Sequence, residues 1–308
     1  MVDAVVVTPF AHARRRAGEA MEIAAAWTLA GPAIALIWIM LLGPAVAVIG
    51  LSLTDWDFGM PTIGWAGLDN YAEMVGDRVF WVSLRNTLVY VAFVVPLSVF
   101  LGLGVALLIE AGSSLRGFYR AAFFLPVTST LLAMALVFQF AFHPSVGIVN
   151  RTLALFGLPT TDWLRNSDAA LFALGVIGIW QAVGLSMVLF LAGLKAIPRD
   201  LYESAAIDGA DGAWERFRRV TWPMLGPATV FVVTITAIRS FQVFDTVAVL
   251  TEGGPNKATN VLLYQMYQEG FSFLRSAYAA ALTCVFLGFV LLLTWLQVKL
   301  LDRRTHYA

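Results

Sequence analysis

The chain has 308 residues, of which 59% are hydrophobic and 13% are charged, and its 20 basic and 20 acidic residues leave no net charge. Soluble domains contain about 45–50% apolar and about 25% charged residues, so this chain has too few charges to cover a water-facing surface of its size. Zero net charge argues against a polyanion such as nucleic acid as a partner. A single cysteine, Cys284, excludes an intramolecular disulfide framework. The composition indicates an integral membrane protein.

Six apolar runs of about 20 residues each predict six membrane-spanning helices. In chain order the predicted spans are 27–53, 86–109, 119–142, 169–194, 225–250 and 277–301. None has the short alternating pattern of a membrane β-barrel strand. We therefore expect an all-α integral membrane protein with a transmembrane domain at 27–301, preceded by a segment at 1–26 and followed by a tail at 302–308.

The basic residues predict the orientation of these spans. Lys and Arg favour segment 1–26, the connections after the second and fourth spans, and the C-terminal end, by about two to one over the other side. The positive-inside rule places this side in the cytoplasm, so we expect both termini there. The first span is too long for the apolar region of a signal peptide and ends without a cleavage pattern. It is expected to be retained, in a bacterial inner membrane.

The longest predicted cytoplasmic loop, residues 195–223, has an internal pattern. Pro198 ends the preceding span, and Asp200 with Glu203 three residues later predicts a capping box at the start of a short helix. Gly209 is a natural stop for that helix. The pattern fits a solvated connection between two spans, and it fits equally well a docking element that lies on the membrane surface.

The same loop carries a family resemblance. Glu203-Ser204-Ala205, then Gly209 and Pro223, resemble the EAA loop of binding-protein-dependent ABC transporter permeases. The longer string YESAAIDGA…WERFRRVTWPML is similar to the sugar and glycerol-3-phosphate (maltose-type) branch, as are GLDNY, RAAFFLP, AGLKAIP and FQVFDTVAVLTEGGP. The sequence departs from the motif at Ser204, where the family usually has Ala.

The resemblance implies a type I importer permease, with six transmembrane helices and a cytoplasmic coupling helix between helices 4 and 5. It also implies three kinds of partner: a second related permease, two copies of a cytoplasmic ATP-binding subunit, and a periplasmic solute-binding protein. The coupling residues carried over are Tyr202, Glu203, Ser204, Ala205, Asp208 and Gly209. Because the sequence contains no G-x-x-x-x-G-K-[ST] phosphate loop, we expect no ATPase site, metal site or cofactor of its own. ATP and Mg would be used by the partner ATPase.

Ionisable residues inside a span are unfavourable by roughly 2.5–3.5 kcal/mol on insertion scales, so the fifth span requires an explanation. Arg239 and Asp245 are six residues apart, about 600° around a continuous helix. We therefore expect them to face different directions and not to neutralise each other. Such a polar span faces either a water-filled cavity, or another helix and the partner permease.

In maltose-type permeases the fourth and fifth spans line the solute pathway, and the resemblance carries this role to matching positions here. Two of these, Leu185 and Val243, are apolar where a maltose pathway has polar groups. The full set of pathway candidates is Gln181, Leu185, Thr236, Arg239, Ser240, Gln242, Val243 and Asp245.

Three kinds of transport remain open from the sequence. The first is ATP-driven import of a neutral sugar, whose hydroxyls Gln181 and Gln242 would suit. The second is import of an anionic solute such as glycerol-3-phosphate, a glycerophosphodiester or a uronate, which the Arg239 guanidinium would attract. The third and least favoured is an ion-driven secondary transporter, in which Arg239 and Asp245 would form an ion relay.

Overall fold

A computed structural model describes residues 21, 25–112, 114–210 and 212–302. This part of the chain is helical, and its only β-type pairing is an isolated bridge between Thr54 and Trp65. The expected all-α class is confirmed. Most of the predicted terminal segments, 1–26 and 302–308, lies outside the described residues, and the domain boundaries stay predictions.

Five described helices are long and apolar enough to cross a membrane. They are the N-terminal helix Ala25–Leu51, which ends in α2 (Gly43–Leu51); α4 (Arg78–Ala111); α8 (Ala170–Ala196); Gly226–Leu250, made of α12 (Gly226–Phe241) and α13 (Asp245–Leu250); and α15 (Ser276–Asp302), apolar over Ser276–Gln297. A sixth span arises if α5 (Arg116–Thr128) and α6 (Leu131–Ala141) count as one.

The third predicted span is not a single straight helix. Its two halves, Arg116–Thr128 and Ala133–Ala141, are bent by 102°. Ser129 and Thr130 between them have extended backbones. The hydroxyls of Thr128 and Ser129 both donate to the Leu125 carbonyl, at 3.0 and 2.9 Å. These bonds satisfy a carbonyl at the broken helix end, as a break at membrane depth requires.

The fifth predicted span is also interrupted. Helix α12 ends at Phe241, and α13 begins at Asp245 after non-helical backbone at Gln242 and Phe244. The expectation of a continuous helix through Arg239 and Asp245 is therefore wrong.

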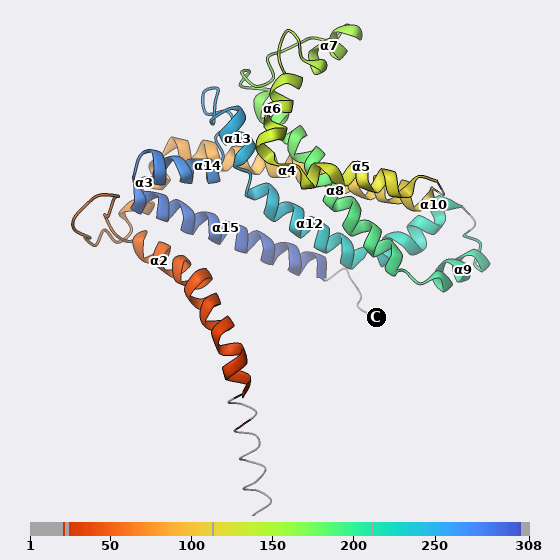
Figure 1. Ribbon diagram of the computed structural model, residues 1–308, viewed down its shortest axis with the longest axis horizontal. Helices are drawn as coiled ribbons and strands as arrows, with labels where there is room; N and C mark the ends of the chain where they lie inside the picture. Colours follow the sequence, from red (N-terminus) through yellow and green to blue (C-terminus); the bar gives the residue numbers. More distant parts are fainter. Residues whose placement is uncertain (1–20, 22–24, 113, 211, 303–308) are drawn as a thin grey trace, which may run out of the picture.

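Helix α8 lies at the centre of the bundle, packed against α4, α5 and α12 (Figure 1). Small residues allow the close approach of α4 and α8. A Cβ atom added to Gly102 would lie 2.4 Å from the Ser186 Cβ, and one added to Gly178 would lie 2.2 Å from the Tyr90 hydroxyl. This packing fixes the α4 face that borders the central cavity described below.

Helix α4 begins at Arg78, eight residues before its predicted start at 86, where the Asp77 side chain caps it by accepting from the Val79 N–H. The Asn86 amide donates to the carbonyls of Lys257 and Asn260 at 3.0 and 2.9 Å. The Thr87 hydroxyl accepts from the Leu262 N–H at 2.9 Å. Helix α14 (Leu262–Tyr267) is thereby held against the start of α4.

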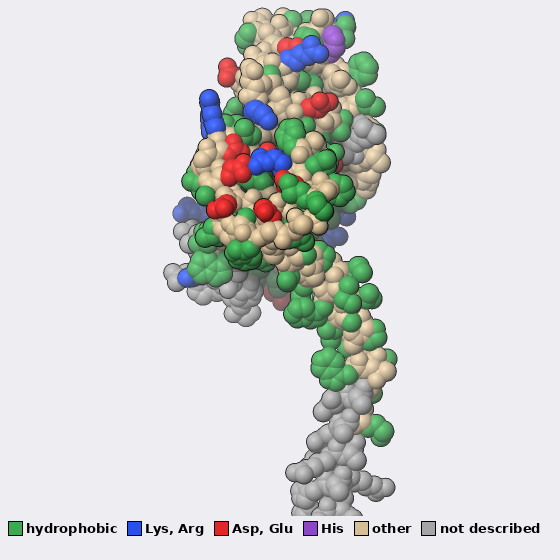
Figure 2. Space-filling model, turned by 90° about the vertical axis from the view of Figure 1, so that its left-hand side faces the viewer, with side chains coloured by type: hydrophobic (Ala, Val, Ile, Leu, Met, Phe, Trp, Pro, Cys, Tyr) green, Lys and Arg blue, Asp and Glu red, His purple; other side chains and the backbone are tan. Residues whose placement is uncertain are grey.

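The N-terminal helix Ala25–Leu51 leads away from this bundle (Figure 1). No residue in its most apolar stretch is buried. Figure 2 shows hydrophobic side chains along this helix, whereas acidic and basic side chains gather on the end of the bundle above it. The helix therefore presents apolar surface that the chain itself leaves uncovered.

Candidate functional site

A cavity of about 400 Å³ lies at the middle of the bundle, between α4, α5, α8 and the interrupted fifth span. All eight pathway residues proposed from the sequence line it: Gln181, Leu185, Thr236, Arg239, Ser240, Gln242, Val243 and Asp245. Residues from the fourth and fifth predicted spans, selected by resemblance and by their polarity, thus line one cavity.

The break between α12 and α13 brings the charged members together. Arg239 lies in the last turn of α12 and Asp245 in the first turn of α13. A cation near a helix C-terminus and an anion near an N-terminus are both favoured by the helix dipole. Both residues line the same cavity, so the expectation that they face different directions is wrong. They form no ion pair with each other, as expected.

The polar side chains of the cavity divide into two groups. The first group bonds within the bundle: the Ser240 hydroxyl donates to the Thr236 carbonyl of the same helix at 2.8 Å, and the hydroxyls of Thr236 and Ser186 lie 3.5 Å apart between α12 and α8. Thr236 thus supports helix packing as well as lining the cavity.

The second group has free hydrogen-bonding capacity. Its members make no side-chain hydrogen bond or ion pair with another described residue; they are Gln181, Arg239, Gln242 and Asp245. Gln181 is half-buried, and Arg239, Gln242 and Asp245 are exposed. These four side chains are therefore free to bind a solute or water inside the cavity.

Sequence reasoning missed several cavity residues, of which Tyr90 on α4 is the most notable. Its side chain is buried and lines the cavity, with the hydroxyl against Gly178 of α8. The other missed lining residues are Val94, Val127, Gly178, Phe244 and Thr246. The glycines of α8 were the available signal, since they mark where another helix approaches closely.

The loop at 195–223 forms the end of the bundle opposite α3 (Asp69–Gly76) and α14 (Figure 1). Its helix α9 (Arg199–Ile207) stops as expected: Gly209 has φ +82°, and the Ala210 N–H donates to the Ala205 carbonyl at 2.8 Å. The predicted capping box is wrong, because Pro198 occupies the N-cap and no side chain caps the helix.

The six predicted coupling residues fall on two sides of this helix. Tyr202 and Ala205 are half-buried against the core, and the Tyr202 hydroxyl lies 3.0 Å from the Thr221 hydroxyl. The others are exposed: Glu203, Ser204, Asp208 and Gly209. Two exposed apolar side chains, Ile207 and Trp214, were not among the predicted residues. The outward face of α9 thus combines acidic, small and apolar groups.

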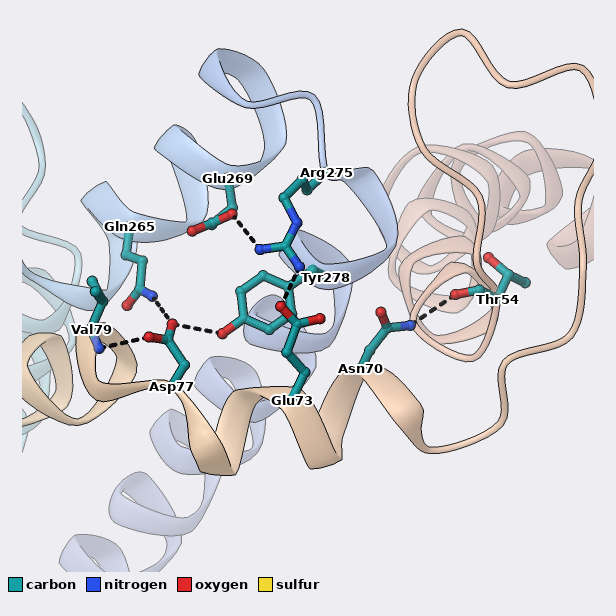
Figure 3. A network of polar contacts seen from close by, with 9 residues as sticks. All are labelled: Thr54, Asn70, Glu73, Asp77, Val79, Gln265, Glu269, Arg275 and Tyr278. Atoms are coloured by element: carbon teal, nitrogen blue, oxygen red, sulfur yellow. Dashed lines mark hydrogen bonds and ion pairs between the residues drawn. The ribbon is translucent and has the colours of Figure 1, made fainter.

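A network of polar contacts closes the opposite end of the bundle (Figure 3). The Asp77 carboxylate accepts from the Val79 N–H at 2.7 Å, the Tyr278 hydroxyl at 2.9 Å and the Gln265 amide at 3.2 Å. Arg275 bonds Glu73 and also donates to Glu269 at 3.2 Å. The network joins α3 and α4 to the segment before α15.

Burial raises the pKa of the Glu269 carboxyl above its ordinary value, although the neighbouring Arg275 acts in the opposite direction. Asp77 and Glu73 add to the increase by repulsion. The charged groups of the network are paired, whereas the Gln265 Oε1 is buried without a hydrogen-bond partner.

Comparison with known proteins matches residues 77–307 to the family described as binding-protein-dependent transport system inner membrane component. The chain is 31% identical over 287 residues to the sn-glycerol-3-phosphate transport system permease protein UgpA of Shigella flexneri, covering 91% of this chain and 95% of that one. It is 32% identical over 278 residues to the sulfoquinovosyl glycerol transport system permease protein SmoG of Agrobacterium fabrum, covering 89% of both. A crystal structure of a bacterial ABC transporter involved in import of the acidic polysaccharide alginate has a similar fold, with a TM-score of 0.79 at 24% identity over 93% of this chain and 99% of that one.

Proposed function

The chain belongs to the family of binding-protein-dependent transport system inner membrane components, and we propose that its central cavity is this subunit's share of a solute pathway. Members of this family are permease subunits of ABC importers, and this chain is such a permease for a sugar or a related solute. The observation that carries the proposal is the meeting of eight expected pathway residues in one cavity, four of them with unpaired polar groups.

The energy for transport comes, in this proposal, from ATP and Mg used by two copies of a cytoplasmic subunit. The permease itself needs no cofactor. The exposed face of α9, with Glu203, Ile207 and Gly209, would dock against that subunit. The cluster formed by Tyr202 and Ala205 would then transmit the movement to the bundle, because it packs against α4, α8 and the start of the fifth span.

A second, related permease would complete the pathway. One feature supports this partner: no residue in the most apolar stretch of the N-terminal helix is buried within the described chain, so this surface is available to a neighbouring subunit. A solute-binding protein would deliver the solute at the end bearing the Asp77 network. This arrangement places α9 and both termini in the cytoplasm, in agreement with the basic residues around α9.

The proposal also concerns the chemical class of the solute. The relatives named above transport sn-glycerol-3-phosphate and sulfoquinovosyl glycerol, two molecules built on glycerol. The unpaired amides of Gln181 and Gln242 suit hydroxyl groups of such a solute, and Arg239 suits an acidic group.

Coupling can be tested in liposomes that contain the complete importer. Glu203→Arg combined with Ser204→Trp alters the exposed face of α9 without touching the cavity, so ATP-dependent uptake and binding-protein-stimulated ATP hydrolysis should both fall at least about tenfold, as for loss of a docking contact. Lys299→Glu, an exposed charge reversal on α15 outside the α9 loop, is the matched control and should leave both unchanged. Unaltered hydrolysis in the double variant would disprove the docking role. Gradient-driven uptake by the purified chain alone would point instead to a secondary transporter.

A further inference from the structure

A second cavity, of about 490 Å³, lies between α5 and α8 near the loop that contains α9. Two of its lining residues are basic, Arg120 on α5 and Lys195 in the last turn of α8. The rest of its wall is apolar, formed by side chains such as Phe124, Val188 and Leu191. None of the described residues that line it is acidic.

This cavity continues the face of the central one. On α8 the residues of the two cavities follow one another at alternating steps of four and three, which keeps them on one side of a helix. That series is Gln181, Leu185, Val188, Ala192 and Lys195. On α5 the same spacing joins Arg120 and Phe124 of the second cavity to Val127 of the central one. A solute that leaves the central cavity along this face toward α9 meets Arg120 and Lys195.

The basic groups there have unused capacity. The Arg120 Nε is buried and has no hydrogen-bond partner. Arg120 forms an ion pair with Glu110, whose Oε2 lies 4.0 Å from an Arg120 Nη and has no hydrogen-bond partner. Lys195 forms no ion pair with a described residue. The site thus has two cations, one nearby carboxylate and an unfilled donor.

We propose that Arg120 and Lys195 form an exit site for the acidic group of an anionic solute, so that the importer carries a small phosphate, sulfonate or carboxylate derivative of a sugar or of glycerol. The inference rests on the proposed function, because that function assigns the solute to this face and the cytoplasm to the α9 end. Guanidinium and ammonium groups bind such oxyanions through charge-assisted hydrogen bonds.

The apolar wall determines how firmly the solute is held. This wall offers no hydrogen bonds to hydroxyl groups, so it gives a neutral sugar no polar contact that would favour binding. An anion is held by the two cations only, which favours entry without a tight complex, as a transit site requires. Arg239, on α12 in the central cavity, is a third cation along this route and receives the same acidic group one stage earlier.

The inference is tested with the complete importer in phosphatidylcholine vesicles, with sn-glycerol-3-phosphate, glycerophosphoglycerol, glucuronate, sulfoquinovosyl glycerol, glycerol and maltose as probes. The wild type should import one of the four anions. Arg120→Gln combined with Lys195→Gln should slow that uptake at least about tenfold, the expected loss for charge-assisted hydrogen bonds. Arg120→Lys and Lys195→Arg should restore most of it, since they keep the charges. Binding-protein-stimulated ATP hydrolysis should stay within about twofold, which a structural defect at the end of α8 would not allow.

Lys299→Gln is the matched control, because Lys299 is exposed at the same end of the bundle and lies over the Trp295 ring, outside both cavities. Import of none of the anions, or unchanged anion uptake in the double variant, overturns the exit site. ATP-driven import of maltose or glycerol in their place overturns it while leaving the proposed function intact. Absence of ATP-driven uptake of every probe overturns both the exit site and the proposed function. A defect seen only when phosphatidylglycerol is added to the vesicles assigns the cations to a membrane lipid and overturns the solute role.

Discussion

The two polar regions of the bundle differ in how their charges are satisfied. At the end near α3, Asp77 accepts three hydrogen bonds and Arg275 contacts two carboxylates. In the central cavity, Arg239 and Asp245 have no partner among the described residues. Paired groups stabilise a fold, whereas unpaired groups at membrane depth are tolerated where they serve a function. The contrast therefore separates residues needed for folding from residues available to a solute.

The largest expected effect is on stability, at the paired end. Asp77→Ala leaves the buried Tyr278 hydroxyl and the Gln265 amide without an acceptor, and should lower the free energy of unfolding by about 3 kcal/mol. The measurement is denaturant unfolding of the purified permease in detergent micelles. Asp168→Ala removes an exposed carboxylate that accepts no hydrogen bond and serves as the control. Equal stability of the two variants would show that the network does not hold α3, α14 and α15 together.

The opposite pattern is expected at the cavity. Arg239→Gln removes a cation that has no side-chain partner in the described chain and interacts favourably only with the dipole of α12, so the free energy of unfolding should change by less than about 1 kcal/mol. Uptake of an anionic solute should nevertheless fall about tenfold or more, because a charge-assisted contact is lost. Unfolding and uptake are measured on the same preparation, with Arg239→Lys as the charge-retaining comparison. A large loss of stability would instead show that Arg239 is needed for folding, and the central cavity would then not differ from the paired end in this respect.

The smallest expected effect is a pH dependence at the paired end. Because the pKa of Glu269 is raised from its ordinary value of 4.5, the folded state keeps this proton to higher pH than the unfolded state. The corresponding stability is fully present below pH 4.5 and is lost as the pH rises through the raised pKa. The free energy of unfolding of the wild type should therefore fall between pH 4 and pH 7 by a contribution that is absent in Glu269→Gln. Identical profiles would mean that Arg275 fully offsets burial.

Composition and periodicity were sufficient to predict where the chain crosses the membrane. An apolar run of about 20 residues marks a span because the hydrocarbon core of the bilayer disfavours polar side chains and unpaired backbone groups. Gly209 could be recognised as a helix stop because its φ of +82° strongly favours glycine. The pathway residues were assembled from a resemblance together with the rarity of ionisable groups inside a span.

The remaining features depend on contacts that a single sequence does not encode. The interruption of the fifth span at 242–244 contains neither Gly nor Pro, so nothing marked it, and the relation of Arg239 to Asp245 was misjudged as a result. Helix α4 starts early, at Arg78, where Asp77 caps it and also accepts hydrogen bonds from Gln265 and Tyr278, far along the chain. The position of Tyr90 in the cavity likewise follows from how α4 and α8 pack.

The uncovered N-terminal helix makes the stability of this protein depend on the amount of its partner subunit. Because no residue of its most apolar stretch is buried and it meets the bundle mainly where α2 contacts α15, it adds little to the cohesion of the bundle and much to any association with a neighbour. Stability gained in that way obeys mass action, growing with the concentration of the partner relative to its dissociation constant. The lifetime of this protein in a membrane would then be set by the supply of its partner, so that unequal synthesis of the two would be corrected by loss of whichever is in excess.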